Sequence, residues 1–184
     1  MKLVVVGEPP VEITSFLARR RALGQDSFDE VWEGEYHVVP APHFWHGQVD
    51  SELAALLRPP AKSAGLVITS QFNLGVKDDY RVPDGGYHRA PLSTVWVPTA
   101  AIVVEVVSPD DETWEKFDFY ARHAVEEVCV ADPLSRQVRW FVLAGDAYEE
   151  AGASPLLAVT NADLVAGIDW PGSGTAKITK DRPG

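Results

Sequence analysis

Apolar residues recur every three to four positions in two stretches of the first third of the chain, which predicts two amphipathic helices. These stretches are 12–23 and 43–57. Pro59 and Pro60 follow the second stretch and are expected to end its helix, because proline removes a backbone donor and restricts the residue before it. Between the helices, 29–39 has the pattern of two short strands joined by a tight turn.

From Gly65 onward the pattern changes to that of strands. Runs rich in β-branched and aromatic residues alternate with turns of Gly, Pro and Asp; they are 66–74, 80–84 before a Gly85-Gly86 turn, 100–108, 126–131 and 137–143. The run 100–108 is the most apolar, which favours a central strand buried on both faces. One helix is expected at 112–124, and short strands and turns after 143. This order predicts an α/β (mixed α+β) fold, a central mixed β-sheet flanked by helices.

The 184 residues are enough for one domain, so we expect a single domain 1–184. Its core spans about 12–170, and a Pro/Gly-rich tail begins at about Pro171. The first apolar run, four residues long, is too short for a signal peptide or a membrane span, which predicts a cytoplasmic protein with no membrane partner. A single cysteine, Cys129, excludes an internal disulfide and a Cys-rich zinc module.

Charge narrows the classes of function. Sixteen basic and 27 acidic residues give a net charge of −11. This balance argues against a protein that coats nucleic acid, because phosphate contacts require a basic face. It leaves room for an enzyme that meets a phosphate through a metal ion, since the ion supplies the positive charge.

Glu105 and Asp84 are candidate functional residues because of their positions in the sequence pattern. Glu105 lies within the run predicted to be buried, where an unpaired carboxylate is costly. It either pairs with a Lys or Arg near the strand end or serves as a metal ligand or acid–base group. Asp84 precedes Gly85-Gly86 and is either a turn residue or a second ligand, since hard cations prefer convergent oxygen atoms.

An ordered set of motifs along the chain resembles the Uma2 family of bacterial proteins. The set comprises Arg81-Val82-Pro83-Asp84, Val103 to Pro109, Glu115 to Tyr120 and Val130 to Pro133, preceded by Asp29 to Glu35, Pro40 to Pro42 and His46. The resemblance covers about 12–170. It implies a restriction-endonuclease-like fold of the PD-(D/E)xK superfamily and an endonuclease activity.

The resemblance also implies a metal site. In nucleases of this superfamily the Asp of the PD motif, here Asp84, and the acidic residue on the next strand, here Glu105, bind Mg²⁺, with Mn²⁺ as the alternative. The backbone carbonyl of Val106 would complete the set. The metal polarises the phosphate and activates the attacking water.

The superfamily usually places a lysine two positions after the acidic residue, on the same strand face. Here residue 107 is Val. The resemblance places a Glu-Lys pair on the following helix, matching Glu115-Lys116, so Lys116 is the expected substitute. Its ammonium is expected within about 4–6 Å of the Glu105 carboxylate, in range to perturb both groups. The alternative is a solvated helix lysine.

Two further residues are candidates by the same resemblance. A third carboxylate comes from Glu35 or Glu30, between which strand alternation cannot decide; Glu35 is favoured because it stands where the family has a Gly-Glu pair. His46, near the start of the second helix, is either a proton shuttle or phosphate contact, or a structural histidine. Tyr120 is expected in the core.

The expected function is therefore a Mg²⁺-dependent endonuclease whose substrate is DNA, and the family's fold suggests a homodimer. Two alternatives stay open. One is a catalytically degenerate nuclease scaffold that serves as a binding or regulatory module. The other is a metal-dependent hydrolase of a small phosphate ester, which needs no wide basic surface.

Overall fold

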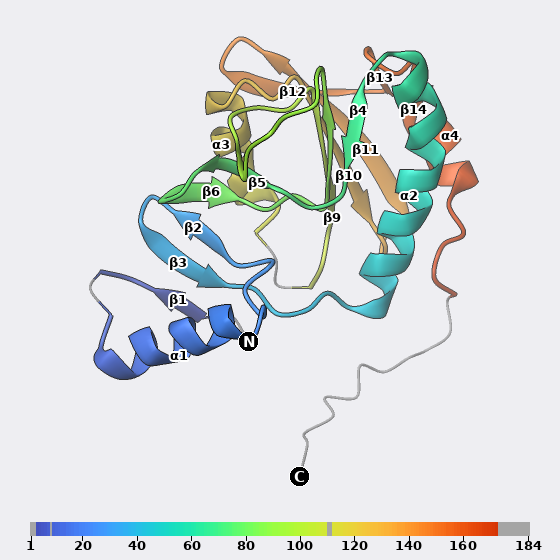
Figure 1. Ribbon diagram of the computed structural model, residues 1–184. Coiled ribbons are helices and arrows are strands. Elements are labelled where there is room, and N and C mark those ends of the chain that lie inside the picture. Colours follow the sequence, from blue (N-terminus) through green and yellow to red (C-terminus); the bar gives the residue numbers. More distant parts are fainter. Residues whose placement is uncertain (1–2, 8, 110–111, 173–184) are drawn as a thin grey trace.

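The computed structural model describes residues 3–7, 9–109 and 112–172. Two six-stranded mixed sheets form its framework (Figure 1). The first contains, in spatial order, β1 (Leu3–Val5), β3 (Glu35–Val38), β2 (Glu30–Trp32), β6 (Asp79–Arg81), β5 (Asn73–Val76) and β8 (Trp96–Val97). The second contains β12 (Ala147–Ala151), β11 (Gln137–Ala144), β10 (Glu127–Asp132), β9 (Ile102–Val106), β7 (Gly85–His88) and β4 (Val67–Thr69).

Helices cover both faces of the second sheet. The described part of the chain forms the helices α1 (Val11–Ala22), α2 (Phe44–Ser63), α3 (Phe117–Arg122) and α4 (Asn161–Gly167), and the short 3₁₀ turn η1 (Trp114–Lys116). Helices α2 and α4 lie on one side of this sheet and α3 on the other (Figure 1). A small third sheet pairs β13 (Ala153–Ser154) with β14 (Val159–Thr160). The mixed α+β architecture expected from the element order is confirmed, with two large sheets in place of one.

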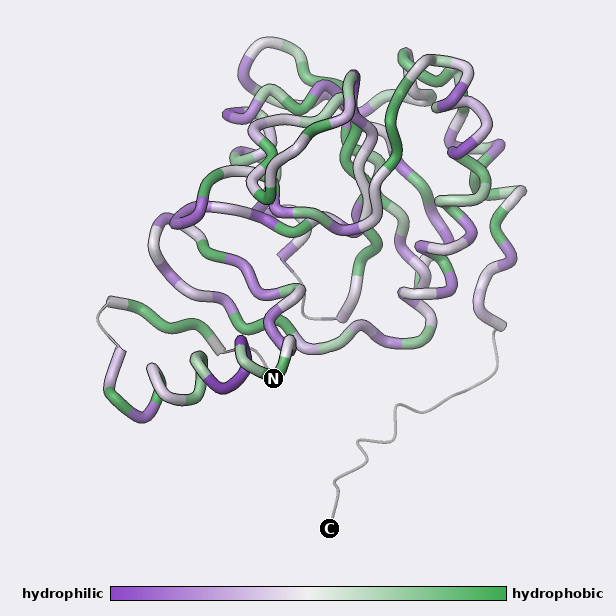
Figure 2. The backbone as a smooth tube through the Cα atoms, viewed as in Figure 1, coloured by the Kyte–Doolittle hydropathy of each residue, from purple (hydrophilic) through white to green (hydrophobic). Residues whose placement is uncertain are grey.

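Strand β9 is the centre of the second sheet, and all five of its residues are buried. Ile102, Val104 and Val106 pack into the core beneath α2, whereas Val103 packs into the core that contains α3. This division follows from strand alternation, and it directs Glu105 toward α3. Hydrophobic residues dominate β9 and its neighbour β10 (Figure 2), as expected for a parallel pair covered on both faces.

The predicted end of the second helix at Pro59-Pro60 is wrong. Helix α2 continues through both prolines to Ser63. The last turn is held by Leu57 and Ala61, which are fully buried in the core beneath the second sheet. Burial of this face outweighs the lost backbone donors, because a proline removes one hydrogen bond whereas each buried apolar side chain contributes about 1.5–3 kcal/mol.

Two predicted strands prove to be crossings between the sheets. The run 66–74 divides into β4 in the second sheet and β5 in the first. Likewise, β6 in the first sheet is followed by β7 in the second, so the predicted Gly85-Gly86 turn is wrong: both glycines are in β7. A Cβ on Gly86 would lie 2.3 Å from the ring of Phe72, so this position needs glycine for close approach.

The C-terminal part contains more regular structure than its sequence predicted. Helix α4 begins at a capping box, in which the Thr160 hydroxyl accepts from the Asp163 backbone N–H and the Asp163 carboxylate accepts from the Thr160 N–H. Strand β1 was not predicted either. Most of the tail expected from Pro171 lies outside the described residues, as do Asp110 and Asp111. No described helix combines the length and the apolar character that a membrane crossing requires.

Candidate active site

Asp84 and Glu105 come together where the chain crosses from the first sheet to the second. Asp84 directly precedes β7, which pairs antiparallel with β9 and sets Gly85 opposite Val104. The next position of this register brings Asp84 to the level of Glu105. The Val106 backbone N–H donates to Asp84 Oδ2 at 2.8 Å, which fixes the carboxylate at the end of β9.

Glu105 is a buried carboxylate, 3% exposed. Its Oε1 lies 3.2 Å from Lys116 Nζ, and the Tyr120 hydroxyl donates to the same oxygen. Burial raises the pKa of Glu105 to about 8; Lys116 opposes this effect, and the charges of Asp84 and Glu30 add to it. Burial and the neighbouring carboxylates thus disfavour the ionised form of Glu105 unless a cation lies beside it.

Lys116 lies between two carboxylates. Its Nζ is 3.0 Å from Glu30 Oε1 and 3.2 Å from Glu105 Oε1, and its side chain is 12% exposed. The ammonium is thus closer to Glu105 than the 4–6 Å expected, and the alternative of a solvated lysine is wrong. Burial lowers the pKa of Lys116, but the neighbouring carboxylates, Glu105 first, outweigh it and raise the pKa above its usual range. Lys116 is charged at neutral pH.

Asp84, Glu105 and Lys116 are called the cluster below. Of the two hairpin carboxylates, the structure brings Glu30 to it. Glu30 Oε1 accepts from the Val82 N–H at 2.7 Å, and Oε2 accepts from Trp32 Nε1 at 2.7 Å. Glu35, which was favoured, makes no hydrogen bond or ion pair with the cluster within the described residues. Glu30 pairs with His37 and Glu35 with Trp32, so both glutamates share one face of the hairpin. Glu35 lies at the turn end, too far along the strand.

His46 links Asp84 to the end of β9. Its Nε2 is 2.8 Å from Asp84 Oδ1, and its Nδ1 is 2.8 Å from Ser108 Oγ. Burial lowers the pKa of His46, but the hydrogen bond with Asp84 and the charges of Asp84, Asp50 and Glu105 outweigh it, so the pKa is raised. The imidazole is held at both nitrogens, beside a carboxylate that stabilises its protonated form.

Three neighbours of the cluster were not predicted as site residues. The Tyr120 hydroxyl contacts Glu105, and Ser108 contacts His46, as described above. The third is Asp50, one helical turn after His46 on α2, whose pKa burial raises to about 6 with help from the charge of Asp84. The spacing of His46 and Asp50 was the signal that could have identified it, because residues four apart share a helix face.

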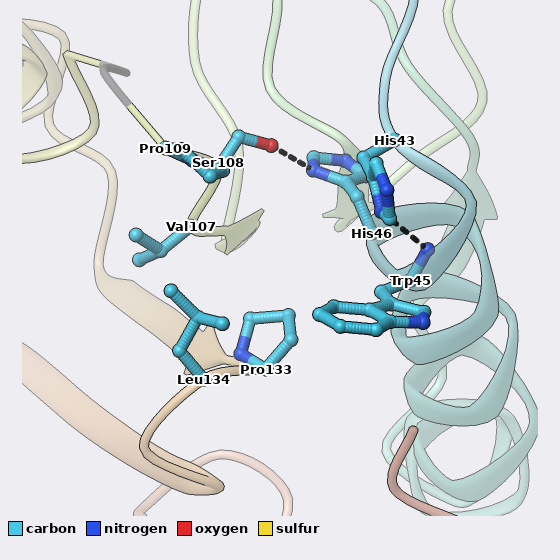
Figure 3. Close-up of a pocket in the computed structure, with 8 residues that line it drawn as sticks. All are labelled: His43, Trp45, His46, Val107, Ser108, Pro109, Pro133 and Leu134. Carbon is cyan, nitrogen blue, oxygen red and sulfur yellow. Dashed lines mark hydrogen bonds between the residues drawn. The ribbon is translucent and has the colours of Figure 1, made fainter. Parts of the chain in front are cut away.

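An apolar pocket opens beside His46. It is lined by His43, Trp45, His46, Val107, Ser108, Pro109, Pro133 and Leu134. These residues come from the start of α2 and from the segments that follow β9 and β10. Figure 3 shows Val107 and Leu134 across the pocket from His46 and Trp45, with Ser108 reaching toward His46.

The side chains near Asp84 and Glu105 include oxygen donors of the kind that bind metal ions. Within the described residues, no group of three or more His, Cys, Asp or Glu side chains is arranged to hold one. Two carboxylates and one backbone carbonyl are nevertheless the oxygen donors that suit Mg²⁺, which is commonly bound by one or two carboxylates and keeps several waters. By chemistry, Asp84, Glu105 and the Val106 carbonyl are donors of this kind.

Comparisons with a family model and with solved structures both match this chain to proteins described as putative nucleases. The family model named Uma2, described as "Putative restriction endonuclease", matches residues 16–171. Among solved structures, the chain is similar to a crystal structure described as a "putative nuclease belonging to DUF820" from Anabaena variabilis ATCC 29413. The two are 16% identical with a TM-score of 0.61, and the match covers 76% of this chain and 90% of the other. At this identity the likeness concerns the fold alone. No curated protein sequence matches the chain.

Proposed function

The chain belongs to the Uma2 family, and we propose that it is a Mg²⁺-dependent endonuclease that hydrolyses phosphodiester bonds of nucleic acid. The observation that carries the proposal is the placement of Lys116, whose ammonium lies between Glu30 and Glu105. A nuclease site of this type needs one cationic group beside its metal-binding carboxylates. The usual strand position holds Val107, and the lysine on η1 supplies the group instead.

Asp84, Glu105 and the Val106 carbonyl would hold the metal ion, which when bound supplies Lewis-acid activation of the phosphate and of a water. Lys116 stabilises negative charge that develops on the phosphate oxygens. Glu30 and Tyr120 position the lysine and Glu105, because each contacts one of them directly. His46 holds Asp84 in place and can take up or deliver a proton next to it.

The test is cleavage of single-stranded and double-stranded DNA by the wild type and by Asp84→Ala, side by side, with Mg²⁺, with Mn²⁺ and with EDTA. We expect metal-dependent cleavage by the wild type and its loss in Asp84→Ala. Glu149→Ala removes an exposed carboxylate of β12, outside the cluster, and serves as the matched control that keeps activity. Cleavage by Asp84→Ala at the wild-type rate, or cleavage that survives EDTA, would contradict the proposal.

A second candidate, a metal-dependent hydrolase of a small phosphate ester, is favoured by the net charge of −11. Such an enzyme would cleave a small phosphodiester under the same conditions while leaving DNA and RNA intact. The third possibility, a degenerate scaffold, is disfavoured because Lys116 contacts both Glu30 and Glu105, and Asp84 is held at the end of the strand that carries Glu105.

A further inference from the structure

The apolar pocket beside His46 has an aromatic side chain in its wall. Its apolar wall consists of Trp45, Val107, Pro109, Pro133 and Leu134. The Trp45 backbone N–H donates to His43 Nδ1 at 3.2 Å, and the indole meets the His43 ring edge to face at 5.1 Å between centroids. An aromatic side chain in a pocket wall offers a surface on which a base can stack.

The pocket adjoins the proposed active site through His46. His46 and Ser108 line it, and His46 contacts Asp84 directly. Val107 and Pro109 lie within four residues of Glu105. The segments after β9 and β10 both stand at the carboxyl ends of parallel strands, where α/β sheets commonly bind ligands. A group in this pocket would therefore be attached next to the phosphate at Asp84.

Internal ion pairs reduce the positive charge that the described residues offer to a nucleic-acid backbone. Seven lysine and arginine side chains are engaged with carboxylates of the chain itself; they are Arg20, Arg21, Arg81, Arg89, Lys116, Arg122 and Arg139. With a net charge of −11, phosphate contacts cannot supply most of the affinity. Stacking of bases on aromatic side chains can, since it is worth about 1–3 kcal/mol for each base.

Resting on the proposed function, we propose that this pocket holds one unpaired nucleobase beside the scissile phosphate, so that the substrate is single-stranded or locally unpaired nucleic acid. A base in a continuous duplex reaches such a pocket only after leaving the stack, which costs a few kcal/mol. In a single strand this cost is largely absent. The Trp45 indole provides the stacking face, and His43, His46 and Ser108 are the polar residues at the pocket.

The first measurement compares cleavage of a single-stranded oligonucleotide with cleavage of the same sequence as a duplex. A second series replaces each nucleotide in turn by an abasic one. We expect the single strand to be cleaved at least tenfold faster, and one abasic position next to the cut bond to lower kcat/KM by about tenfold, the size of one lost stacking contact. Trp45→Ala should lower kcat/KM on the intact strand by a similar factor and should have no further effect on that abasic strand.

Leu134→Ala tests the opposite wall and should reduce the same preference for an intact base. Leu92→Ala, which truncates another exposed leucine in a different part of the fold, is the matched control and should change nothing. Equal effects of Trp45→Ala on intact and abasic strands, or faster cleavage of the duplex, would overturn the pocket assignment while leaving the nuclease proposal standing.

A binding measurement tests the base pocket independently of cleavage. Fluorescence anisotropy measures affinity for the intact and abasic strands in EDTA, where no cleavage is expected. If the wild type never cleaves yet binds the intact strand about tenfold more tightly in a Trp45-dependent way, the nuclease proposal fails and the base pocket is supported. If the affinity is the same for intact and abasic strands and is unchanged in Trp45→Ala, the pocket assignment fails.

Discussion

At the scale of single residues, the side chain on which the proposed chemistry depends most is Lys116. The alternation of β9 assigns position 107 to the catalytic face, yet an aliphatic side chain stands there, and the ammonium arrives from another element. Because it is desolvated and held by two carboxylates, its position is fixed before any substrate binds. Preorganised charge of this kind stabilises a transition state without reorganisation at the moment of reaction.

Lys116→Ala should lower kcat by about 10²-fold with little change in KM, because the lost interaction is made mainly in the transition state. Lys116→Arg should restore little, since a planar fork does not reproduce a compact ammonium between two carboxylates. Steady-state cleavage kinetics measure both effects. Lys77→Ala, at an exposed position between β5 and β6, is the control.

Lys116→Ala should also destabilise the fold by about 3–5 kcal/mol, because it leaves Glu30 and Glu105 buried without their common cation. Urea unfolding gives this value and identifies the conditions under which the variant is folded for kinetics. A fully folded Lys116→Ala variant that turns over like the wild type would remove this lysine from the mechanism.

Glu105→Ala should abolish Mg²⁺ binding while the protein stays folded. Lys116 keeps its contact with Glu30 in this variant, so the substitution does not strand a buried charge. Isothermal titration calorimetry with Mg²⁺ measures the binding, and circular dichroism checks the fold. Glu150→Ala, which removes an exposed carboxylate of β12, should bind Mg²⁺ as the wild type does. A titration unchanged in Glu105→Ala would show that Glu105 is not a ligand.

At the scale of elements, contacts between the first sheet and α3 hold the site together. Arg81 at the end of β6 is the clearest of them. Its guanidinium lies between the ring of Trp32 from β2, at 4.2 Å, and that of Phe119 from α3, at 4.1 Å. Trp32 in turn donates to Glu30. The stacked arginine therefore sets the distance between the hairpin that carries Glu30 and the helix that follows Lys116.

Arg81→Lys should destabilise the protein by about 2 kcal/mol or more, because an ammonium keeps the charge but loses the planar stacking on two desolvated rings. Thermal and urea unfolding measure the loss. Arg139 also lies over two rings, Trp114 and Phe141, but it is partly exposed and paired with Glu150. Arg139→Lys should change stability by less than 1 kcal/mol or so, as for surface pairs. Equal losses in the two variants would contradict this account.

Helix α2 offers a separate test of how its prolines are tolerated. Pro59 is exposed, and within the helix it leaves the carbonyl of Ala55 without its usual donor. Pro59→Ala restores that donor, so stability should rise by about 2 kcal/mol, less than the full cost of a helical proline because the unfolded chain gains freedom. A higher urea midpoint is the expected result; Arg58→Ala, at the neighbouring exposed position, should leave it unchanged. A midpoint that falls in Pro59→Ala would show that the prolines fit the local backbone.

At the scale of the whole molecule, the single cysteine reports on global unfolding. Cys129 lies in β10, fully buried between neighbouring strands, and burial raises the pKa of its thiol. A thiol that is neither accessible nor ionised does not react, because the thiolate is the nucleophile. Labelling by a thiol reagent should therefore be absent in buffer and should follow the loss of circular dichroism across a urea titration. Rapid labelling of the native protein would show that the second sheet opens locally.

The sequence by itself determined the features that depend on neighbouring residues. The hydrophobic periods located both long helices and the buried strand β9, because side-chain direction in a helix or strand follows directly from spacing. The order of the motifs indicated the family, and with it Asp84, Glu105, Lys116 and His46 as one group. Glu105 was conspicuous without any structure, since a carboxylate within a buried strand must have a partner.

Only the tertiary structure decided which residues from distant parts of the chain contact one another. The choice between Glu30 and Glu35 depended on the register of a hairpin and on its distance from η1, neither of which alternation encodes. The end of α2 depended on burial of Leu57 and Ala61 by the second sheet, which outweighed the local effect of two prolines. The crossing at Asp84 and the pocket beside His46 are formed by segments far apart in the chain. Such contacts arise when distant segments pack together, and their energies are set by that packing and not by local sequence.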